Sequence, residues 1–353
     1  MGDLFRRFWI PILLSEELPD PDCDPIRIKV VGDFFVAFRD TSGRLGLLDA
    51  RCPHRGADLS FGFNEEGGLR CGRCFWKFDV DGNILDLPME PADSPLWHQV
   101  KAPAFKIREY GGLIWGYVGP QDQDPEIPEF EWTHVPAENR HLSRFLVECN
   151  YMQGVEAGLD SARVSALEKS GLYDIKNFMS EEPEHQVIAK VTDYGLAVTT
   201  QLLADGTDTS DIQVTHWLMP FYTTAPVTTR NIQEGIAWVP IDDEATMAFA
   251  VTYNLVKPLS KTMRDQIRKG QRVHPQHADG TVRRKRNKDN GYVGEKKRRS
   301  GFTDFASRFS STFEMTVACQ ESMGTIVDRS QENLSENDGA ILGARSSLRE
   351  AAV

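Results

Sequence analysis

The sequence predicts an α+β protein with a small antiparallel β-domain first and a sheet wrapped around a long helix second. Three observations predict this class. Before residue 119, short alternating segments follow one another, with turn residues roughly every 8–12 positions. A Pro- and acid-rich stretch at 119–132 then marks a boundary. After it the pattern changes to a helix, strands and two more helices, which is typical of α+β rather than βαβ architecture.

The first domain, which we set at residues 1–130, is predicted to consist of strands and hairpins. Apolar and polar residues alternate in segments bounded by Gly, Asp and Ser. One of these segments is a hairpin that closes on Asp81-Gly82. The strand-like segments are 26–40, 43–50, 77–87, 100–110 and 111–119.

The second domain, residues 131–353, opens with a predicted helix. In residues 149–171 apolar side chains recur every three or four positions, and the helix is expected to break near Gly158. An antiparallel sheet and two C-terminal helices follow. The strand-like runs are 184–203, 211–222 and 235–255, and the helical runs are 301–325 and 339–352.

Composition indicates a cytoplasmic protein that binds neither nucleic acid nor membrane. The chain of 353 residues is long enough for two domains, and its net charge of −12 argues against nucleic acid as a general partner. The longest apolar run near the start, FWIPILL, is too short to span a membrane, and no cleavage site follows it. Six cysteines, three of them in one motif, favour a metal site in a reducing compartment over a disulfide framework.

One stretch is basic, although the chain as a whole has a negative net charge. Between Arg264 and Arg299 there are thirteen Lys or Arg against four acidic residues. The stretch is interpreted either as a solvated loop between core elements or as a basic groove for an acidic partner protein or an anionic aromatic acid.

The segment Arg51–Phe78 contains four potential soft-metal ligands, Cys52, His54, Cys71 and Cys74. They form C-x-H and C-x2-C pairs separated by a Gly-rich connection. Such paired spacing is typical of two loops that grip one metal centre, and thiolate and imidazole suit iron–sulfur clusters and zinc. The alternative is that the cysteines are small buried hydrophobes and that His54 is a core histidine.

These residues resemble the Rieske [2Fe–2S] motif of ring-hydroxylating oxygenase large (alpha) subunits. C-P-H-R-G-A followed by G-G-L-R-C-x-x-[ligand]-x-W-K-F-D-x-D-G-N is similar to the phthalate-dioxygenase-like branch. The resemblance implies that Cys52 and Cys71 bind one iron and that His54 binds the other. It also implies a Rieske domain followed by a helix-grip catalytic domain.

Cys74 departs from this pattern, because the family has a second histidine there. The ligand set becomes Cys52, His54, Cys71 and Cys74, which we expect to bind a [2Fe–2S] cluster. Zinc is the rival occupant, because three cysteines and one histidine are also an ordinary structural zinc set. A thiolate in place of an imidazole is expected to lower the reduction potential.

In the second domain, N-Y-x-Q-x-x-E-x-x-x-D-S, Q-E-S-M-G and D-R-S-x-E also resemble the family. The resemblance implies an iron triad of two histidines and one aspartate. Those positions hold Arg163, Glu168 and Thr316, with Glu314 as the alternative if the register slips by two. Arginine cannot donate a lone pair to a metal. We therefore expect no mononuclear iron and no catalytic residue here.

Two expectations follow for the vacated site. Arg163 and Glu168 are expected to pair with each other, because a buried charge needs a partner. Asp160 matches the family's bridging aspartate between subunits, and the alternative is an ordinary helix-surface carboxylate.

Three functions remain open. The favoured one is a non-catalytic structural or regulatory subunit (a pseudoenzyme) that assembles with an intact oxygenase paralogue and possibly its reductase. The expected assembly is a trimer-based hetero-oligomer, a hexamer of two trimers. The second is an active mono- or dioxygenase of an aromatic acid whose iron is held by unusual carboxylates, Glu156, Asp160 or Glu168. The third is a stand-alone iron–sulfur electron-transfer protein.

Overall fold

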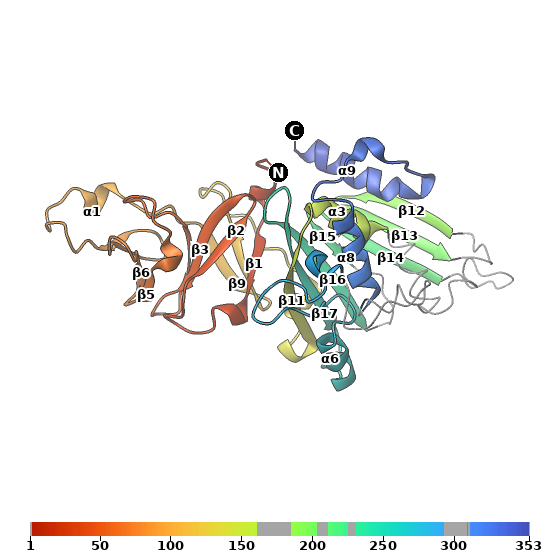
Figure 1. Cartoon of the computed structure of the whole chain (residues 1–353), viewed down its shortest axis with the longest axis horizontal. Coiled ribbons are helices and arrows are strands. Elements are labelled where there is room, and N and C mark those ends of the chain that lie inside the picture. Colours follow the sequence, from red (N-terminus) through yellow and green to blue (C-terminus); the bar gives the residue numbers. More distant parts are fainter. Residues whose placement is uncertain are drawn as a thin grey trace. The chain divides into compact units, whose positions relative to one another are not determined.

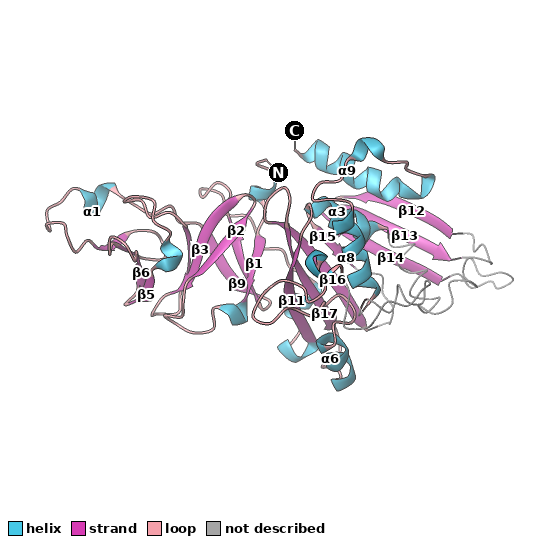
Figure 2. Cartoon of the chain, in the orientation of Figure 1, coloured by secondary structure: helices cyan, strands magenta, loops and turns pink. Residues whose placement is uncertain are grey.

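The computed structural model describes residues 2–160, 185–202, 211–224, 231–292, 309 and 311–352. The chain divides into two compact units, Met1–Thr133 and His134–Val353. Strands dominate the N-terminal unit, and in the C-terminal unit helices lie against one large sheet (Figure 2). The α+β class predicted from the sequence is confirmed.

The N-terminal unit is built from three small antiparallel sheets, ordered β1-β10-β9, β2-β3-β4 and β5-β6-β7-β8. Its core includes Val36, Phe38, Leu48 and Phe78, all fully buried. The strands are β1 (Ile10–Leu14), β2 (Ile26–Val30), β3 (Asp33–Arg39), β4 (Leu45–Asp49), β5 (Phe63–Glu65), β6 (Gly68–Arg70), β7 (Lys77–Phe78), β8 (Ile84–Asp86), β9 (Lys106–Tyr110) and β10 (Leu113–Tyr117); the helices are α1 (Leu96–Gln99) and α2 (Glu131–His134), the latter ending at the boundary between the units.

The C-terminal unit contains one seven-stranded antiparallel sheet, ordered β11-β17-β16-β15-β14-β13-β12. Helices α3, α8 and α9 lie close to it in Figure 1, α3 packing on β14, β15 and β16 and α9 on β12 and β13. The strands are β11 (Arg140–Val147), β12 (His185–Thr192), β13 (Gly195–Leu202), β14 (Asp211–Leu218), β15 (Tyr222–Thr224), β16 (Ile232–Pro240) and β17 (Thr246–Asn254); the helices are α3 (Tyr151–Leu159), α6 (Lys261–Arg268), α8 (Thr312–Ser322) and α9 (Gly339–Ala351).

Two glycines let helix α3 approach the sheet closely. A Cβ atom at Gly154 would lie 2.3 Å from the ring of Trp238, and one at Gly158 would lie 2.8 Å from the Thr223 side chain. No side chain fits in those spaces, so these glycines set the distance between helix and sheet. The helix then ends at Leu159, one residue beyond the break expected at Gly158; the rest of the predicted helix, 161–171, lies outside the described residues.

Helix α6 was not predicted from the sequence. Ser260 begins it, its side chain accepting a hydrogen bond from the backbone N–H of Met263 at 3.1 Å. Within the described residues, no helix is long and apolar enough to cross a membrane.

A buried histidine connects two strands and the segment after α6. His274 is 2% exposed; its Nδ1 lies 2.6 Å from Ser143 Oγ and its Nε2 lies 2.9 Å from Thr252 Oγ1. Burial holds the pKa of His274 well below its usual range, and the neighbouring charges of His141, Arg272 and His277 act in the same direction. The native protein therefore keeps this ring neutral.

We expect the C-terminal unit to lose stability as the pH falls below about 6.5. The unfolded chain binds a proton at His274 there and the native chain does not, so acid favours unfolding by up to about 1.4 kcal/mol per pH unit. Denaturant unfolding measured between pH 8 and pH 5 checks this, and His274→Gln should flatten the dependence. His98→Gln, at an exposed position of the N-terminal unit, is the control; an equal flattening there would contradict the assignment.

Candidate metal centre

Two loops of the N-terminal unit share one backbone frame. The first loop, Cys52–Ala57, follows β4, and the second loop, Cys71–Trp76, joins β6 to β7. In each, the N–H of the first residue donates to the carbonyl of the sixth, at 2.8 Å in both. The N–H of the fifth residue donates back to the first carbonyl, at 2.8 and 3.0 Å. The frame turns the chain sharply around the cysteine that opens each loop.

The fifth position of each loop has a left-handed backbone. Gly56 has φ +74° and Phe75 has φ +62°. Glycine takes this conformation freely, whereas a side chain there costs about 1–2 kcal/mol. Phe75 is also 48% exposed, so few contacts offset the strain.

Phe75→Gly is expected to stabilise the N-terminal unit by about 1 kcal/mol, because it removes the left-handed strain at the cost of some chain entropy. Gly56→Ala is the matched reverse change. No heavy atom lies within 4 Å of a Cβ placed there, so its expected loss of about 1 kcal/mol is a backbone effect alone. Thermal unfolding of the full chain measures both; a loss of stability in Phe75→Gly would show that the phenyl ring's contacts outweigh the strain.

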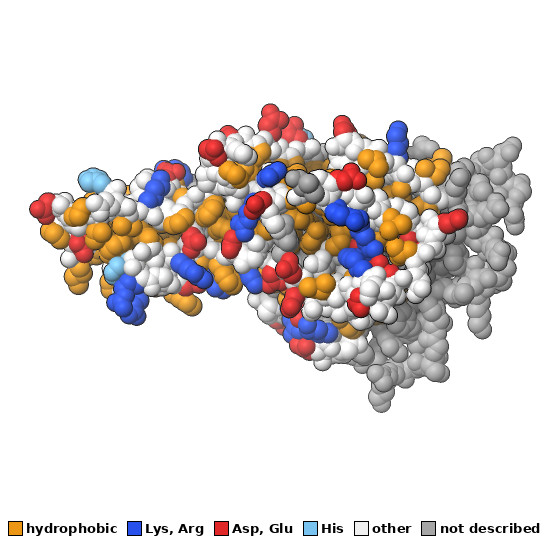
Figure 3. Space-filling model, turned by 90° about the horizontal axis from the view of Figure 1, so that it is seen from above, with side chains coloured by type: hydrophobic (Ala, Val, Ile, Leu, Met, Phe, Trp, Pro, Cys, Tyr) orange, Lys and Arg blue, Asp and Glu red, His pale blue; other side chains and the backbone are white. Residues whose placement is uncertain are grey.

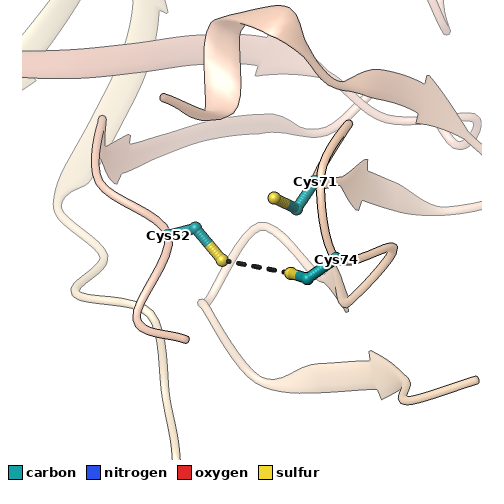
Figure 4. A group of neighbouring side chains, drawn as sticks. All are labelled: Cys52, Cys71 and Cys74. Carbon is teal, nitrogen blue, oxygen red and sulfur yellow. Dashed lines mark hydrogen bonds between the residues drawn. The ribbon is translucent and has the colours of Figure 1, made fainter. Parts of the chain in front are cut away.

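Three thiols converge between the loops. The Sγ atoms of Cys52, Cys71 and Cys74 all lie within 4.8 Å of one another. Those of Cys52 and Cys74 are 3.6 Å apart and face each other across the two loops (Figure 4). Cys52 and Cys71 are buried and Cys74 is half-buried. Within the described residues, this is the one group of three or more His, Cys, Asp or Glu side chains that could hold a metal ion.

The surroundings of the thiols differ. Burial raises the pKa of Cys52 and, less strongly, that of Cys74. Burial acts in the same direction on Cys71, but the backbone N–H groups of Cys74 and Arg73, together with hydrogen bonds from the thiols of Cys74 and Cys52, outweigh it and lower the pKa of Cys71. Backbone donors aimed at sulfur favour the thiolate, which is the form that binds metals.

His54 lies on the first loop but outside the group of three sulfurs. Its exposed imidazole stacks on the buried ring of Trp76, with centroids 4.5 Å apart and an interplanar angle of 16°. The structure therefore brings together three of the four candidate ligands and places the fourth on the same pair of loops.

Arg70 braces the second loop, and sequence reasoning did not find this role. Its guanidinium donates to the carbonyl of Phe75 at 2.8 Å and pairs with Glu65 and Asp86 at 2.9 and 2.7 Å. The only signal in the sequence was an arginine directly before the Cys71 loop.

Of the three positions that the family resemblance matches to the iron triad, only Thr316 lies in the described part of the chain. It is on α8, and its hydroxyl donates to the carbonyl of Thr312 at 3.0 Å. Glu314, two residues earlier, is fully buried and pairs with Arg286 at 3.2 Å. Arg163 and Glu168, and their expected pairing, lie outside the described residues. Asp160 ends α3 as its C-cap.

The side chains of the family-like strings tie α3 to the C-terminal segments. Gln153 donates to the carbonyls of Gln320 and Gly324, at 3.0 Å each, and accepts from the N–H of Val327 at 3.1 Å. Glu156 accepts from Arg329 at 2.6 Å and from Arg345 at 2.8 Å. These hydrogen bonds span more than 160 residues of sequence and connect α3 to the C-terminal segments.

Glu321 of Q-E-S-M-G joins a buried ion pair. It pairs with Arg284 at 2.5 Å, and both side chains are 1% exposed. It also accepts from the Tyr292 hydroxyl and from the Glu148 N–H, at 2.8 Å each. The Q-E-S-M-G segment therefore contributes to the packing of the C-terminal unit.

In the part of the basic stretch that the structure describes, several cations pair with carboxylates of the same unit, whereas Lys269 and Lys285 are exposed. The pairs include Arg272 with Glu234, Arg283 with Glu148 and Asp289, Arg284 with Glu321, Arg286 with Glu314, and Lys288 with Glu148. The two interpretations from the sequence, a solvated loop and a basic groove, stay predictions.

Comparison with protein-family models covers nearly the whole chain. Residues 8–106 match the model described as "Rieske [2Fe-2S] domain", and residues 116–353 match "LigXa C-terminal domain like".

Two related proteins are oxygenase subunits. The chain is 32% identical to the phthalate 4,5-dioxygenase oxygenase subunit of Pseudomonas putida, over 99% of this chain and 82% of that one. It is 33% identical to the 3-chlorobenzoate-3,4-dioxygenase oxygenase subunit of Comamonas testosteroni, over 70% of this chain and 59% of that one.

Solved structures share the fold. Dicamba monooxygenase bound to 3,6-dichlorosalicylic acid superposes with a TM-score of 0.69 at 18% identity, covering 98% of this chain and 97% of that one. The QL mutant of NdmA from Pseudomonas putida CBB5, with theobromine, superposes with a TM-score of 0.66 at 18% identity, covering 98% of this chain and 90% of that one.

The chain therefore belongs to the alpha subunits of Rieske-type aromatic oxygenases. Within that family, it is similar along its length to the phthalate 4,5-dioxygenase oxygenase subunit.

Proposed function

We propose that this chain is a non-catalytic subunit of a Rieske-type oxygenase, working beside a paralogue that keeps the iron triad. One observation carries the proposal: the three positions that match the triad hold Arg163, Glu168 and Thr316. An arginine cannot ligate Fe²⁺ and would place a positive charge at its site.

The retained framework supports the same role. Gln153, Glu156 and Glu321 are family-like residues that hold α3, α8 and the C-terminal segments together through hydrogen bonds and ion pairs. A chain that keeps these contacts without iron ligands is suited to assembly. Glu156 accepts from two arginines, which speaks against its service as an unusual iron ligand.

The Rieske-type site is assigned to Cys52, His54, Cys71 and Cys74. The donors fit a [2Fe–2S] cluster in kind, since clusters of this type are held by thiolates and, in Rieske centres, also by imidazoles. Such a cluster stores one electron. The three sulfurs within 4.8 Å would also suit zinc. Iron, zinc and acid-labile sulfide measured on anaerobically purified protein distinguish the two; one zinc and no sulfide would exclude the cluster.

The partner is an intact paralogue, in a hexamer of two trimers supplied with electrons by a reductase. The related proteins named above act on phthalate and 3-chlorobenzoate, so an aromatic acid is the proposed substrate class of the complex. Turnover depends on the paralogue's iron.

Coexpression with the paralogue tests this assembly. We expect both chains to elute together in size-exclusion chromatography, with a mass by light scattering near six subunits. Removing a histidine ligand from the paralogue should abolish product formation. The proposal fails if this chain runs alone as a homotrimer while the paralogue is soluble and fully active without it.

Restoring the triad provides an independent check. The triple variant Arg163→His, Glu168→His, Thr316→Asp should bind iron beyond the amount at the Rieske-type site, whereas the wild-type chain should not. Iron counted per chain, after correction for labile sulfide, measures this. Stoichiometric additional iron in the wild type would contradict the non-catalytic assignment.

A further inference from the structure

The cysteine at position 74 creates a thiol pair across the two loops. Its Sγ lies 3.6 Å from that of Cys52, a residue 22 positions earlier. A disulfide bond is about 2.05 Å long, so the two sulfurs need to approach by about 1.5 Å. We propose that, in the metal-free protein, Cys52 and Cys74 form a reversible disulfide that latches the first loop to the second.

The exposure of the three cysteines determines which sulfur reacts first. Cys74 is half-buried, whereas Cys52 is 2% exposed and Cys71 is fully buried. A small disulfide from solution, such as glutathione disulfide, reaches Cys74 first. Cys52 then lies beside the sulfur that has been modified.

The exchange is balanced with glutathione disulfide as the oxidant. The Cys74 sulfur attacks one glutathione sulfur, the glutathione S–S bond breaks, and one glutathione leaves as a thiol with the Cys74 proton. The Cys52 sulfur then attacks Cys74, and the second glutathione leaves with the Cys52 proton. Two protein thiols are oxidised and one glutathione disulfide is reduced to two thiols.

Cys71 is the competitor for Cys74, because C-x2-C pairs can also form disulfides. Here the two residues belong to one loop, whose frame curls around Cys71: Phe75 donates to the Cys71 carbonyl, and the Cys71 N–H donates to Trp76. The sulfur of Cys52 comes from the opposite loop and faces Cys74 directly (Figure 4). The geometry therefore favours the link between loops over the link within one.

Metal and disulfide exclude each other, because both use the same sulfurs. The Cys52–Cys74 disulfide would hold the two loops together after loss of the metal, and a thiol reductant would break it. This function is independent of the proposed partnership and of which metal the site holds.

Trypsin separates the three cysteines, which makes the link directly identifiable. Cleavage after Arg and Lys places them in the peptides 52–55 (CPHR), 71–73 (CGR) and 74–77 (CFWK). Full-length protein stripped of metal by a chelator is incubated with glutathione disulfide, alkylated with iodoacetamide and digested without reductant.

Mass spectrometry should find peptide 52–55 joined to peptide 74–77, and dithiothreitol should abolish the joined species. Metal-loaded protein treated in the same way should give no such link. Cys319→Ser, which removes an exposed cysteine of α8, should form the link as the wild type does, and Cys74→Ser should not. A link from peptide 71–73 to either of the others, three free thiols after oxidation, or equal linking in metal-loaded protein would overturn the proposal.

Discussion

Replacing Glu321 by alanine should lower the free energy of unfolding of the C-terminal unit by about 3–5 kcal/mol. The change leaves Arg284 as an unpaired charge at 1% exposure, and the loss of one partner from a buried ion pair is far costlier than the loss of a surface pair. The Tyr292 hydroxyl and the Glu148 N–H lose their acceptor as well.

Hydrogen–deuterium exchange of the α8 amides measures this effect locally, which avoids interference from the other unit. Asp265→Ala is the matched control, because it breaks a pair with Arg268 whose side chains are 44% and 69% exposed. An exposed pair contributes about 0–1 kcal/mol. If both variants lose the same protection, the buried pair does not have the energetic weight assigned to it.

The second large effect concerns the metal centre. Cys74→His restores the histidine of the Rieske pattern, and we expect the reduction potential to rise by on the order of 100 mV or more. A thiolate adds negative charge next to the iron and favours the oxidised state, whereas a neutral imidazole does not. Redox titration of the anaerobically purified variant, followed by visible absorption, gives the potential.

Cys319→Ser is the control for that titration, since Cys319 is an exposed cysteine on α8 in the other unit. Its potential should equal that of the wild type. Equal potentials in Cys74→His and wild type would mean that Cys74 is not a ligand.

Local patterns carried most of what could be predicted. The paired spacing of Cys52, Cys71 and Cys74 predicted their convergence because each loop is a short, continuous segment with its own hydrogen bonds. Alternation and helical period predicted the α+β order for the same reason. The stacking of His54 on Trp76 was not predicted, because ring orientation depends on side chains from both loops.

The basic stretch shows where sequence reasoning fails. Arg284 and Glu321 are 37 residues apart, and no local pattern records that a distant carboxylate will neutralise a particular arginine. A count of charges therefore could not show that Arg284 is buried against Glu321 while Lys285 beside it is exposed. Helix α6 escaped prediction because, of its eight residues, only Ile267 is a buried hydrophobic.

Three phenylalanines on the outside of the N-terminal unit are exposed to solvent. Phe61, Phe63 and Phe75 are 80%, 52% and 48% exposed, and Figure 3 shows hydrophobic side chains reaching the surface in this unit. Phe63 pairs in register with Arg70, which donates to the carbonyl of Phe75 in the second loop. Exposed apolar side chains mark an interaction surface where they form a contiguous patch.

The common frame of the two loops has a consequence for how metal chemistry changes during evolution. Main-chain hydrogen bonds close both loops, and none of them uses the side chain at the third position of the first loop or at the fourth position of the second. A change of residue at either position therefore leaves these hydrogen bonds in place. Histidine and cysteine can then replace each other at these positions on the same backbone. A change of one codon can therefore convert a metal centre of high reduction potential into one of low potential or one that is redox-inert. The same pair of loops offers protein engineers a place to assemble new ligand sets.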